Sequence, residues 1–556
     1  MRGVAMLAAI TAVVFPASFA RAETPVTYTV SPRFEGQALT ALQVEIEVTT
    51  DSSGKVRLSL PKTWMGHGHL WRNLRDLAVD GGASIAEDGD DIRLIRSAPG
   101  RRLVVRYTLS SVIDHEPRES DGYPALPWVR PDWFFVDTDS ALPTVHGHDA
   151  APARLRWKGW PSGFAVDSSF VERPDLTETA MGGGLLIGGR DLRIVRADEV
   201  RLAIHGRFDN VDNPVLAQDL RTILRAERGF FGETDHAPYL IAAATLTRED
   251  GEAFSGTGKQ DAFGLTVTPG LSLDQLRPYL AHEFFHAWNP TRLGGPESAS
   301  SRYWFSEGFT DFYMRRILVR EGLITPQAFV DLWNGMLRAY ATSPARNLTG
   351  EEAGRAFWTD RFAEKLPYQR GALLAALWDE RLRAKGSSLD AVIRAQARTA
   401  ANKTEKTSAI DLFIAQAAKA GLDVRPDIAA FAERGESIVL PSTAFAPCAD
   451  VVEVIEPVFD LGFTPTVGND GVRKVTALVS DSPAARAGLR GDEVILDKLS
   501  GNNGDPGLAY VLKVQGSDGA VRTVSFLPQG KAQATYPQLR MRPEVAAKPT
   551  LCAFGR

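Results

Sequence analysis

His282-Glu283-Phe284-Phe285-His286 is the stretch around which the middle of this chain is organised. In a helix, residues four apart lie on one face about a turn apart, so the imidazoles of His282 and His286 can bind one metal ion. Glu283 then stands beside that ion as a general base. The pattern therefore predicts a helix that carries two metal ligands and a proton acceptor.

Residues 304–311 provide the ligand that the first stretch lacks. A catalytic zinc has three protein ligands and one open position, and Glu307 is the predicted third ligand. The nitrogen and oxygen donors favour Zn²⁺, one ion per chain. Asp311, one helical turn after Glu307, is expected to accept the second N–H of a ligating imidazole. Asn289 is expected either to help orient a ligating imidazole, as Asp311 does, or to cap the end of its helix.

The alternative to a metal site is a surface helix with scattered histidines. Phe284, Phe285, Ala287 and Trp288 are apolar, so the helix is expected to be largely buried, and buried polar side chains need partners. Tyr368 is the predicted donor to an oxyanion, or else an aromatic residue packed on the core. Two further histidine pairs have no evident third ligand and are interpreted as loop or surface residues: His67 with His69, and His146 with His148.

The composition is that of a multidomain globular protein. The chain has 556 residues, 44% of them apolar and 24% charged, and this length predicts several domains. A formal net charge of -5 gives no support for a nucleic-acid partner or for binding to a membrane surface. The sequence does not reveal the oligomeric state.

The first 22 residues have the pattern of a secretory signal. A positive Arg2 precedes an apolar run that ends in Ala20-Arg21-Ala22, which predicts cleavage before Glu23, export to the periplasm or medium, and no stable membrane anchor. The only two cysteines, Cys448 and Cys552, could form one disulfide in an exported protein.

Three folded regions follow the signal, and together they predict a multidomain α+β protein. Alternating apolar residues indicate a β-rich domain over residues 23–205. Helical periodicity indicates an α-rich domain over 206–440, whose metal-binding helix begins at a capping box at Ser272. Short strands and a short helix indicate a β domain over 446–530, and residues 531–556 are expected to form a weakly patterned tail.

The two central stretches, read from His282 to Asn289 and from Trp304 to Tyr313, resemble the glycyl aminopeptidase family of gluzincin metallopeptidases. The segment Tyr368-Gln369-Arg370-Gly371 is similar to another motif of that family. The resemblance implies a β-rich N-terminal domain, a thermolysin-like catalytic domain and a C-terminal PDZ-like domain. It also implies zinc, hydrolysis near the N-terminus of peptides and a preference for small first residues.

Two segments bear on what the site accepts. The family usually has a glutamate on the strand before the metal-binding helix, where it can hold a substrate amine, but this sequence has Gly256, Gly258 and Lys259 in that stretch. A cation there would repel an N-terminal ammonium. Asp460-Leu461-Gly462-Phe463 resembles a PDZ carboxylate-binding loop, although the following sequence leaves little room for the helix that walls a PDZ groove.

The sequence therefore predicts an exported zinc metallopeptidase with aminopeptidase-like action on peptides or proteins. Because of Lys259, an endopeptidase or an enzyme that reads a substrate carboxylate is an alternative. A catalytically idle PDZ-type binding protein and a zinc hydrolase of non-peptide substrates are further alternatives. The complete ligand set, with Glu283 present, argues against the idle protein.

Overall fold

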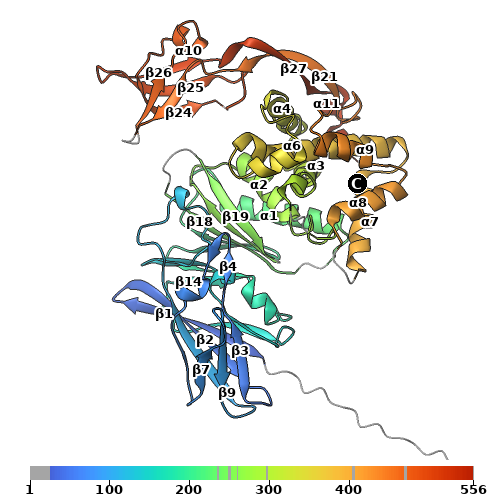
Figure 1. Ribbon diagram of the computed structural model, residues 1–556. Coiled ribbons are helices and arrows are strands. Elements are labelled where there is room, and N and C mark those ends of the chain that lie inside the picture. The colour runs from blue at the N-terminus through green and yellow to red at the C-terminus, as the bar shows by residue number, and fades with distance from the viewer. Residues whose placement is uncertain are drawn as a thin grey trace, which may run out of the picture. The chain divides into compact units, whose positions relative to one another are not determined.

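The computed structural model describes residues 25–234, 237–247, 252–259, 261–295, 299–403, 407–468, 472–501 and 503–554. The signal sequence expected over residues 1–22 lies outside these ranges. The chain divides into two compact units, residues 1–193 and 194–556 (Figure 1). In the part of the chain that is described, no helix has the length and apolar character needed to span a membrane.

The first unit is built from β-sheets, and an apolar core lies between them. The alternation from Leu42 to Val48 places Leu42, Val44, Ile46 and Val48 in this core, because successive side chains of a strand point to opposite faces. The strand orders are β13-β1-β2-β9-β6, β10-β11-β15-β14 and β12-β3-β8-β7, with a separate β4-β5 pair. The strands are β1 Val26–Glu35, β2 Ala38–Thr49, β3 Lys55–Ser59, β4 Thr63–Trp64, β5 His67–Gly68, β6 Arg75–Val79, β7 Ser84–Glu87, β8 Ile92–Arg96, β9 Arg102–Leu109, β10 Trp128–Val129, β11 Trp133–Asp137, β12 Thr144–Val145, β13 Ala153–Trp157, β14 Ala165–Ser168 and β15 Leu185–Gly189.

The second unit begins with a five-stranded sheet in the order β16-β17-β18-β20-β19. Strands β17, β18 and β20 are parallel, and β19 pairs antiparallel with β20 at the edge. Its strands are β16 Arg193–Ala197, β17 Val200–His205, β18 Tyr239–Thr245, β19 Phe254–Lys259 and β20 Ala262–Val267. The expected domain limit at residue 205 therefore differs from the structure, since β17 joins the sheet of the second unit through its pairing with β18.

Helices make up most of the remainder of this unit and enclose its core. They are α1 Asn213–Phe230, α2 Leu273–Phe285, α3 Phe309–Arg320, α4 Pro326–Thr342, α5 Gly350–Ala356, α6 Arg361–Ala384, α7 Leu389–Ala401, α8 Ala409–Lys419 and α9 Arg425–Asp427, with 3₁₀ or π turns η5 Ser300–Arg302, η6 Trp304–Gly308 and η7 Ile428–Glu433. The capping box at Ser272 is present, and α2 continues through Pro278. The structure thus agrees with a mixed α+β architecture, β-rich first and helical in the middle.

The C-terminal region is a small sheet carried on a long two-stranded ribbon (Figure 1). The sheet has the order β22-β23-β24-β25-β26, and β21 pairs with β27 to form the ribbon. The elements are β21 Ala449–Phe459, β22 Thr464–Val467, β23 Arg473–Thr476, α10 Pro483–Arg486, β24 Val494–Ser500, β25 Tyr510–Gln515, β26 Val521–Phe526, β27 Gln529–Met541, α11 Glu544–Ala547 and η8 Pro549–Ala553.

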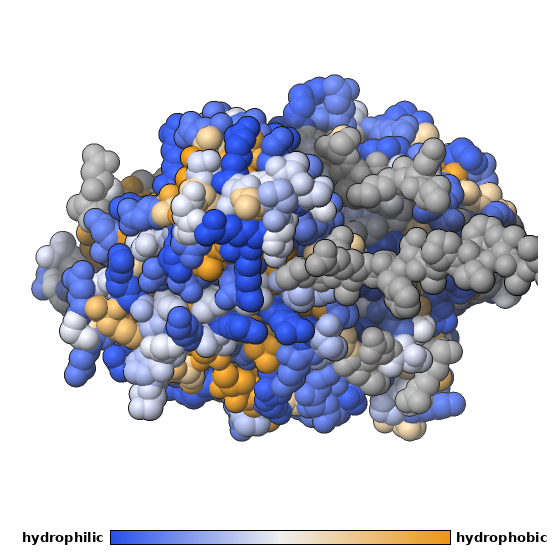
Figure 2. All heavy atoms as spheres, turned by 90° about the horizontal axis from the view of Figure 1, so that it is seen from below, coloured by the Kyte–Doolittle hydropathy of each residue, from blue (hydrophilic) through white to orange (hydrophobic). Residues whose placement is uncertain are grey.

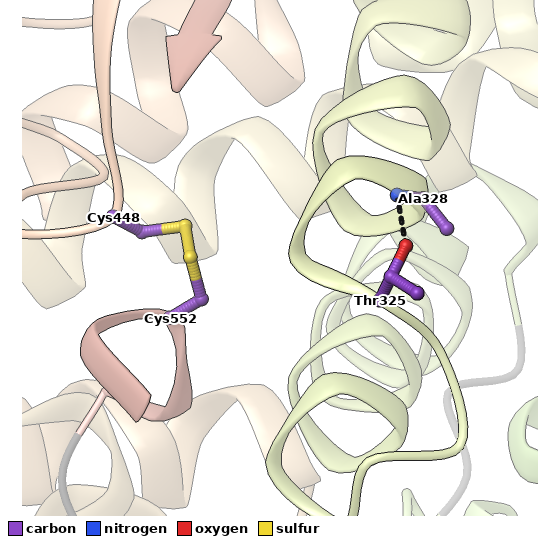
Figure 3. The surroundings of a disulfide bond; sticks show 4 residues. All are labelled: Thr325, Ala328, Cys448 and Cys552. Atoms are coloured by element: carbon purple, nitrogen blue, oxygen red, sulfur yellow. Dashed lines mark hydrogen bonds between the residues drawn. A yellow bond between two sulfur atoms is a disulfide. The ribbon is translucent and has the colours of Figure 1, made fainter. Parts of the chain in front are cut away.

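The expectation of a weakly patterned tail after residue 530 is wrong. Strand β27 runs from Gln529 to Met541 and so occupies the first part of that region, and Asn334 of α4 exchanges two hydrogen bonds with the backbone of Leu539. Partial exposure on both faces removes the alternation by which a strand is recognised. Cys448 and Cys552 form the expected disulfide, which joins the start of the ribbon to η8 (Figure 3). In the same view Thr325 caps α4 through the N–H of Ala328.

Of the four histidines predicted to be loop or surface residues, three are exposed and His148 is partly buried. Hydrophilic side chains predominate on the face in Figure 2, and apolar ones occur there in small groups, as is usual for protein surfaces. His67, His69 and His146 are exposed. Among the described residues, the group of histidines and acidic residues that could hold a metal ion lies elsewhere, at residues 282, 286 and 307.

Candidate metal centre

Three side-chain atoms from two neighbouring elements converge within the second unit. His282 and His286 come from α2 and the residue that ends it, and Glu307 comes from η6. The two imidazole Nε2 atoms are 3.1 Å apart, and Oε2 of Glu307 lies 3.3 Å from Nε2 of His282 and 3.4 Å from Nε2 of His286. Donors bound at about 2.0–2.1 Å to a tetrahedral zinc lie roughly 3.3 Å from one another. The triangle therefore fits the size of such an ion.

The outer nitrogens of both imidazoles have acceptors. Nδ1 of His282 is 2.9 Å from Oδ1 of Asp311, and Nδ1 of His286 is 2.9 Å from the backbone oxygen of Asn289. A backbone carbonyl only accepts, so Nδ1 of His286 is the donor and its Nε2 is available as a ligand. The same reasoning applies to His282 opposite the carboxylate of Asp311. Both imidazoles are thus held in the orientation that metal ligation requires.

The electrostatics show that the triangle attracts positive charge. Burial disfavours an imidazolium, yet the bonds to Asp311 and Glu307 raise the pKa of His282 to about 10. Burial would raise the pKa of Glu307, but the two histidines lower it well below its usual range. A proton can bridge two of these three atoms, whereas a metal ion can bind all three. The donor set therefore fits a divalent cation.

Asp311 is itself held by a second charge. Its Oδ2 is 2.9 Å from the guanidinium of Arg315, one turn later on α3. Burial would raise the pKa of Asp311, but Arg315 and the bond with His282 lower it to about 2. Asp311 therefore stays ionised and able to accept from His282. Arg315 was not predicted, although its four-residue spacing from Asp311 could have indicated it.

Glu307 lies in a π turn, not in the regular helix that its spacing from Asp311 predicts. The turn η6 spans five residues and continues into α3. Such turns occur frequently at functional sites, because they displace side chains from the regular helical position. The Nδ2 of Asn289 donates to the backbone oxygens of Phe305 and Ser306 and to Oγ1 of Thr310. The side chain of Asn289 thus holds the turn that carries Glu307. The backbone oxygen of Asn289 orients His286.

A close contact with α6 holds the other side of this turn. An ideal Cβ on Gly371 would lie 1.8 Å from the backbone oxygen of Trp304 and 2.8 Å from Cα of Gly308. An ideal Cβ on Gly308 would lie 2.3 Å from Cα of Gly371. The two backbones therefore touch where a side chain on either residue would separate them. This contact brings Tyr368, one turn earlier on α6, toward the metal ligands.

Glu283 and Tyr368 flank the triangle. Burial raises the pKa of Glu283, while His286 and His282 act in the opposite direction. The ring of Tyr368 stacks on His282 with the centroids 5.7 Å apart, and burial together with Glu307 raises the pKa of its hydroxyl. A protonated hydroxyl at this position can donate a hydrogen bond to a developing oxyanion. The site thus contains a potential base and a potential hydrogen-bond donor near the three candidate metal ligands.

The predicted substrate-binding residues Gly256, Gly258 and Lys259 lie on the edge strand β19. An ideal Cβ on Gly256 would lie 2.5 Å from the ring of Phe263, so this glycine provides packing space. The Phe254 ring contacts Tyr279, one turn before Glu283, at a centroid distance of 4.1 Å. Lys259 is five residues farther along the strand, about 16 Å from Phe254. A role for these residues in binding a substrate stays a prediction.

The predicted carboxylate loop, Leu461, Gly462 and Phe463, precedes β22. Gly462 has φ +73°, and its N–H donates to Oδ1 of Asp460 at 2.8 Å. Phe463 packs in the small core of this sheet. Residues 501 and 503–509, within the described chain, form no helix that could wall a groove. Peptide binding here, and the likeness to a PDZ domain, stay predictions.

Comparison with known proteins bears directly on the segment that contains the candidate metal ligands. Residues 275–367 match the family of M61 glycyl aminopeptidases. This segment contains both histidines, Glu283, Glu307 and Asp311, and it ends one residue before Tyr368. The resemblance to glycyl aminopeptidases is therefore confirmed for this part of the chain. A search of curated proteins finds no match.

Solved structures of other proteins were compared with this chain. A protein from Idiomarina loihiensis, described as an aminopeptidase N family protein, has a TM-score of 0.63 at 16% identity, with 93% of this chain and 98% of that chain covered. An M1 zinc metallopeptidase from Deinococcus radiodurans has a TM-score of 0.41 at 17% identity, with 75% and 94% covered. Yeast LTA4 hydrolase has a TM-score of 0.39 at 14% identity, with 77% and 70% covered. The first of these has a similar fold over 93% of this chain.

Proposed function

We propose that this protein is a zinc metallopeptidase that hydrolyses peptide bonds, with aminopeptidase-like action as the first expectation. The observation that carries the proposal is the triangle of His282, His286 and Glu307, whose three donor atoms lie 3.1–3.4 Å apart beside Glu283. The M61 match of residues 275–367 supports it. A zinc ion held by these residues would supply Lewis-acid polarisation of the peptide carbonyl and acidification of water.

The protein's own residues carry the proton transfers. Glu283, with its raised pKa, accepts a proton from the attacking water and passes it to the leaving amine. The hydroxyl of Tyr368 donates to the carbonyl oxygen as negative charge develops there. Asp311 keeps Nδ1 of His282 protonated, so that Nε2 can bind the metal.

Removal of the metal tests the proposal. The purified protein is expected to contain one zinc per chain, to lose cleavage of a peptide mixture on chelation, and to regain it with one equivalent of Zn²⁺. Glu307→Ala removes one of the three proposed ligands. We expect this variant to bind zinc much more weakly than the unaltered protein, because only two protein ligands remain. Absence of bound metal, or cleavage that chelation does not affect, would contradict an enzyme that uses this site and would favour a binding protein.

The peptide mixture also distinguishes the modes of cleavage. Each peptide is supplied with a free and with an acetylated N-terminus. Preferential cleavage of the free forms supports the aminopeptidase, whereas cleavage of both forms at internal bonds supports an endopeptidase. The second outcome has a specific basis in Lys259, whose positive charge on the edge strand β19 would not attract an ammonium group.

We further propose that the protein is exported. The charged start and apolar run of residues 1–22 support this, as does the Cys448–Cys552 disulfide, since disulfides persist in oxidising compartments. N-terminal sequencing of protein recovered outside the cytoplasm is expected to begin at Glu23. Recovery only of chains that begin at Met1 would contradict export.

A further inference from the structure

A cavity of about 520 Å³ opens directly beside the candidate metal centre. Glu307 and Tyr368 form part of its lining, so a molecule in the cavity reaches both a metal ligand and the predicted oxyanion donor. Binding pockets for small molecules commonly measure about 300–1,000 Å³. The volume is far larger than the side chain of glycine or alanine requires.

Aromatic rings form one wall of this cavity. Tyr303, Phe357 and Trp358 all line it. The rings of Tyr303 and Phe357 meet edge to face at 5.2 Å, and those of Phe357 and Trp358 do so at 4.8 Å. Phe357 is buried, whereas Trp358 is 79% exposed. An indole left in solvent at the edge of a cavity is a large contact surface that a ligand can cover.

The charged residues of the lining already have local partners. Oδ1 of Asp360 accepts from the N–H groups of Phe362 and Ala363 and so caps α6. Glu364 accepts from Nζ of Lys365 at 2.8 Å. The guanidinium of Arg361 lies over the ring of Phe362, 4.7 Å from its centroid. The aromatic wall, and not the charges, is therefore the surface that is left for recognition.

We propose that this cavity, which we call the Trp358 pocket, binds an aromatic side chain of the substrate next to the scissile bond. This inference rests on the proposed function, since the metal centre places the scissile bond. Offset or edge-to-face contact with Trp358 would add to the burial of the ligand ring. The specificity differs from the preference for small first residues that the family resemblance implies.

Binding and cleavage are measured separately to test the pocket. The zinc-loaded Glu283→Gln protein is titrated calorimetrically with three dipeptide amides, Phe-Ala, Ala-Phe and Ala-Ala, and the unaltered protein is assayed for their hydrolysis. We expect one of the two phenylalanine peptides to bind at least tenfold more tightly than Ala-Ala. Whichever binds more tightly shows on which side of the scissile bond the pocket lies.

The pocket residue is then altered in the same background. Trp358→Ala is expected to reduce the tenfold preference for phenylalanine to threefold or less. Val439→Ala removes a side chain that is 80% exposed but does not line the pocket, and it is expected to leave the preference intact. Circular dichroism of both variants checks that the fold is retained. An unchanged preference in Trp358→Ala would overturn the proposal.

The two proposals fail differently. Tight, Trp358-dependent binding of a phenylalanine peptide without hydrolysis of any peptide would refute the peptidase and leave the pocket. Hydrolysis in which phenylalanine peptides are bound no better than Ala-Ala would refute the pocket and leave the peptidase.

Discussion

Replacing Glu283 with glutamine is expected to lower kcat by about a thousandfold while the zinc content stays at one per chain. Glutamine has nearly the shape of glutamate but cannot accept a proton at this position. Glu283 lies beside the metal triangle without belonging to it, and the three donor atoms come from His282, His286 and Glu307. Loss of the proton acceptor should therefore affect turnover and spare metal binding.

The measurement combines initial rates on peptides with metal analysis of the same samples. Asp274→Asn is the matched control, because it makes the same chemical change on the same helix at a side chain that is 91% exposed. We expect this control to retain activity within about twofold, as surface substitutions usually have small effects. Full activity in Glu283→Gln would refute the assigned base. Loss of zinc from that variant would show that Glu283 supports the metal and would require a different division of roles.

Replacing Gly371 with alanine is expected to destabilise the protein by about 3 kcal/mol or more and to weaken zinc binding. The added methyl group would lie 1.8 Å from the backbone oxygen of Trp304, which cannot move as a flexible side chain would. Separation of α6 from the π turn η6 would displace Glu307 from the histidines. The expected results are a lower thermal unfolding temperature and weaker retention of zinc against a chelator.

Gly335→Ala is the matched control for this substitution. Gly335 lies in the middle of α4, is exposed, and an ideal Cβ there has no neighbour within 4 Å. Alanine in a helix is favoured over glycine, so we expect stabilisation of up to about 1 kcal/mol and unchanged zinc binding. A Gly371→Ala protein as stable as the unaltered one would show that the contact between the two backbones relaxes at little cost.

The local part of the site follows from sequence spacing, and the longer-range part does not. His282 and His286 share a face because they are four residues apart in one helix, and Asp311 follows Glu307 by the same interval. The π turn at Glu307 has no such local signal. It depends on hydrogen bonds from Asn289 and on contact with Gly371, which is 64 residues farther along the chain. Interactions at that separation cannot be read from periodicity.

In the fold, too, the elements with local sequence patterns were predicted and those that depend on distant partners were not. The alternation over β2 and the capping box of α2 are local patterns, and both elements form as predicted. Strand β27 was missed because its partner β21 lies about 80 residues earlier and because neither face of the ribbon is fully buried. The boundary of the first unit was placed too late, since β17 resembles the preceding strands in sequence but pairs with β18. Pairing partners, not strand propensity, decide these assignments.

The disulfide between Cys448 and Cys552 spans a sequence separation of 104 residues and has a topological consequence. The sheet β22–β26 lies wholly inside this covalent ring, and the chain enters and leaves it side by side through β21 and β27. The sheet is therefore an insertion whose entry and exit points are adjacent. A backbone cut anywhere within the ring would leave both fragments linked through sulfur, so the C-terminal residues could not diffuse away from the helices they contact.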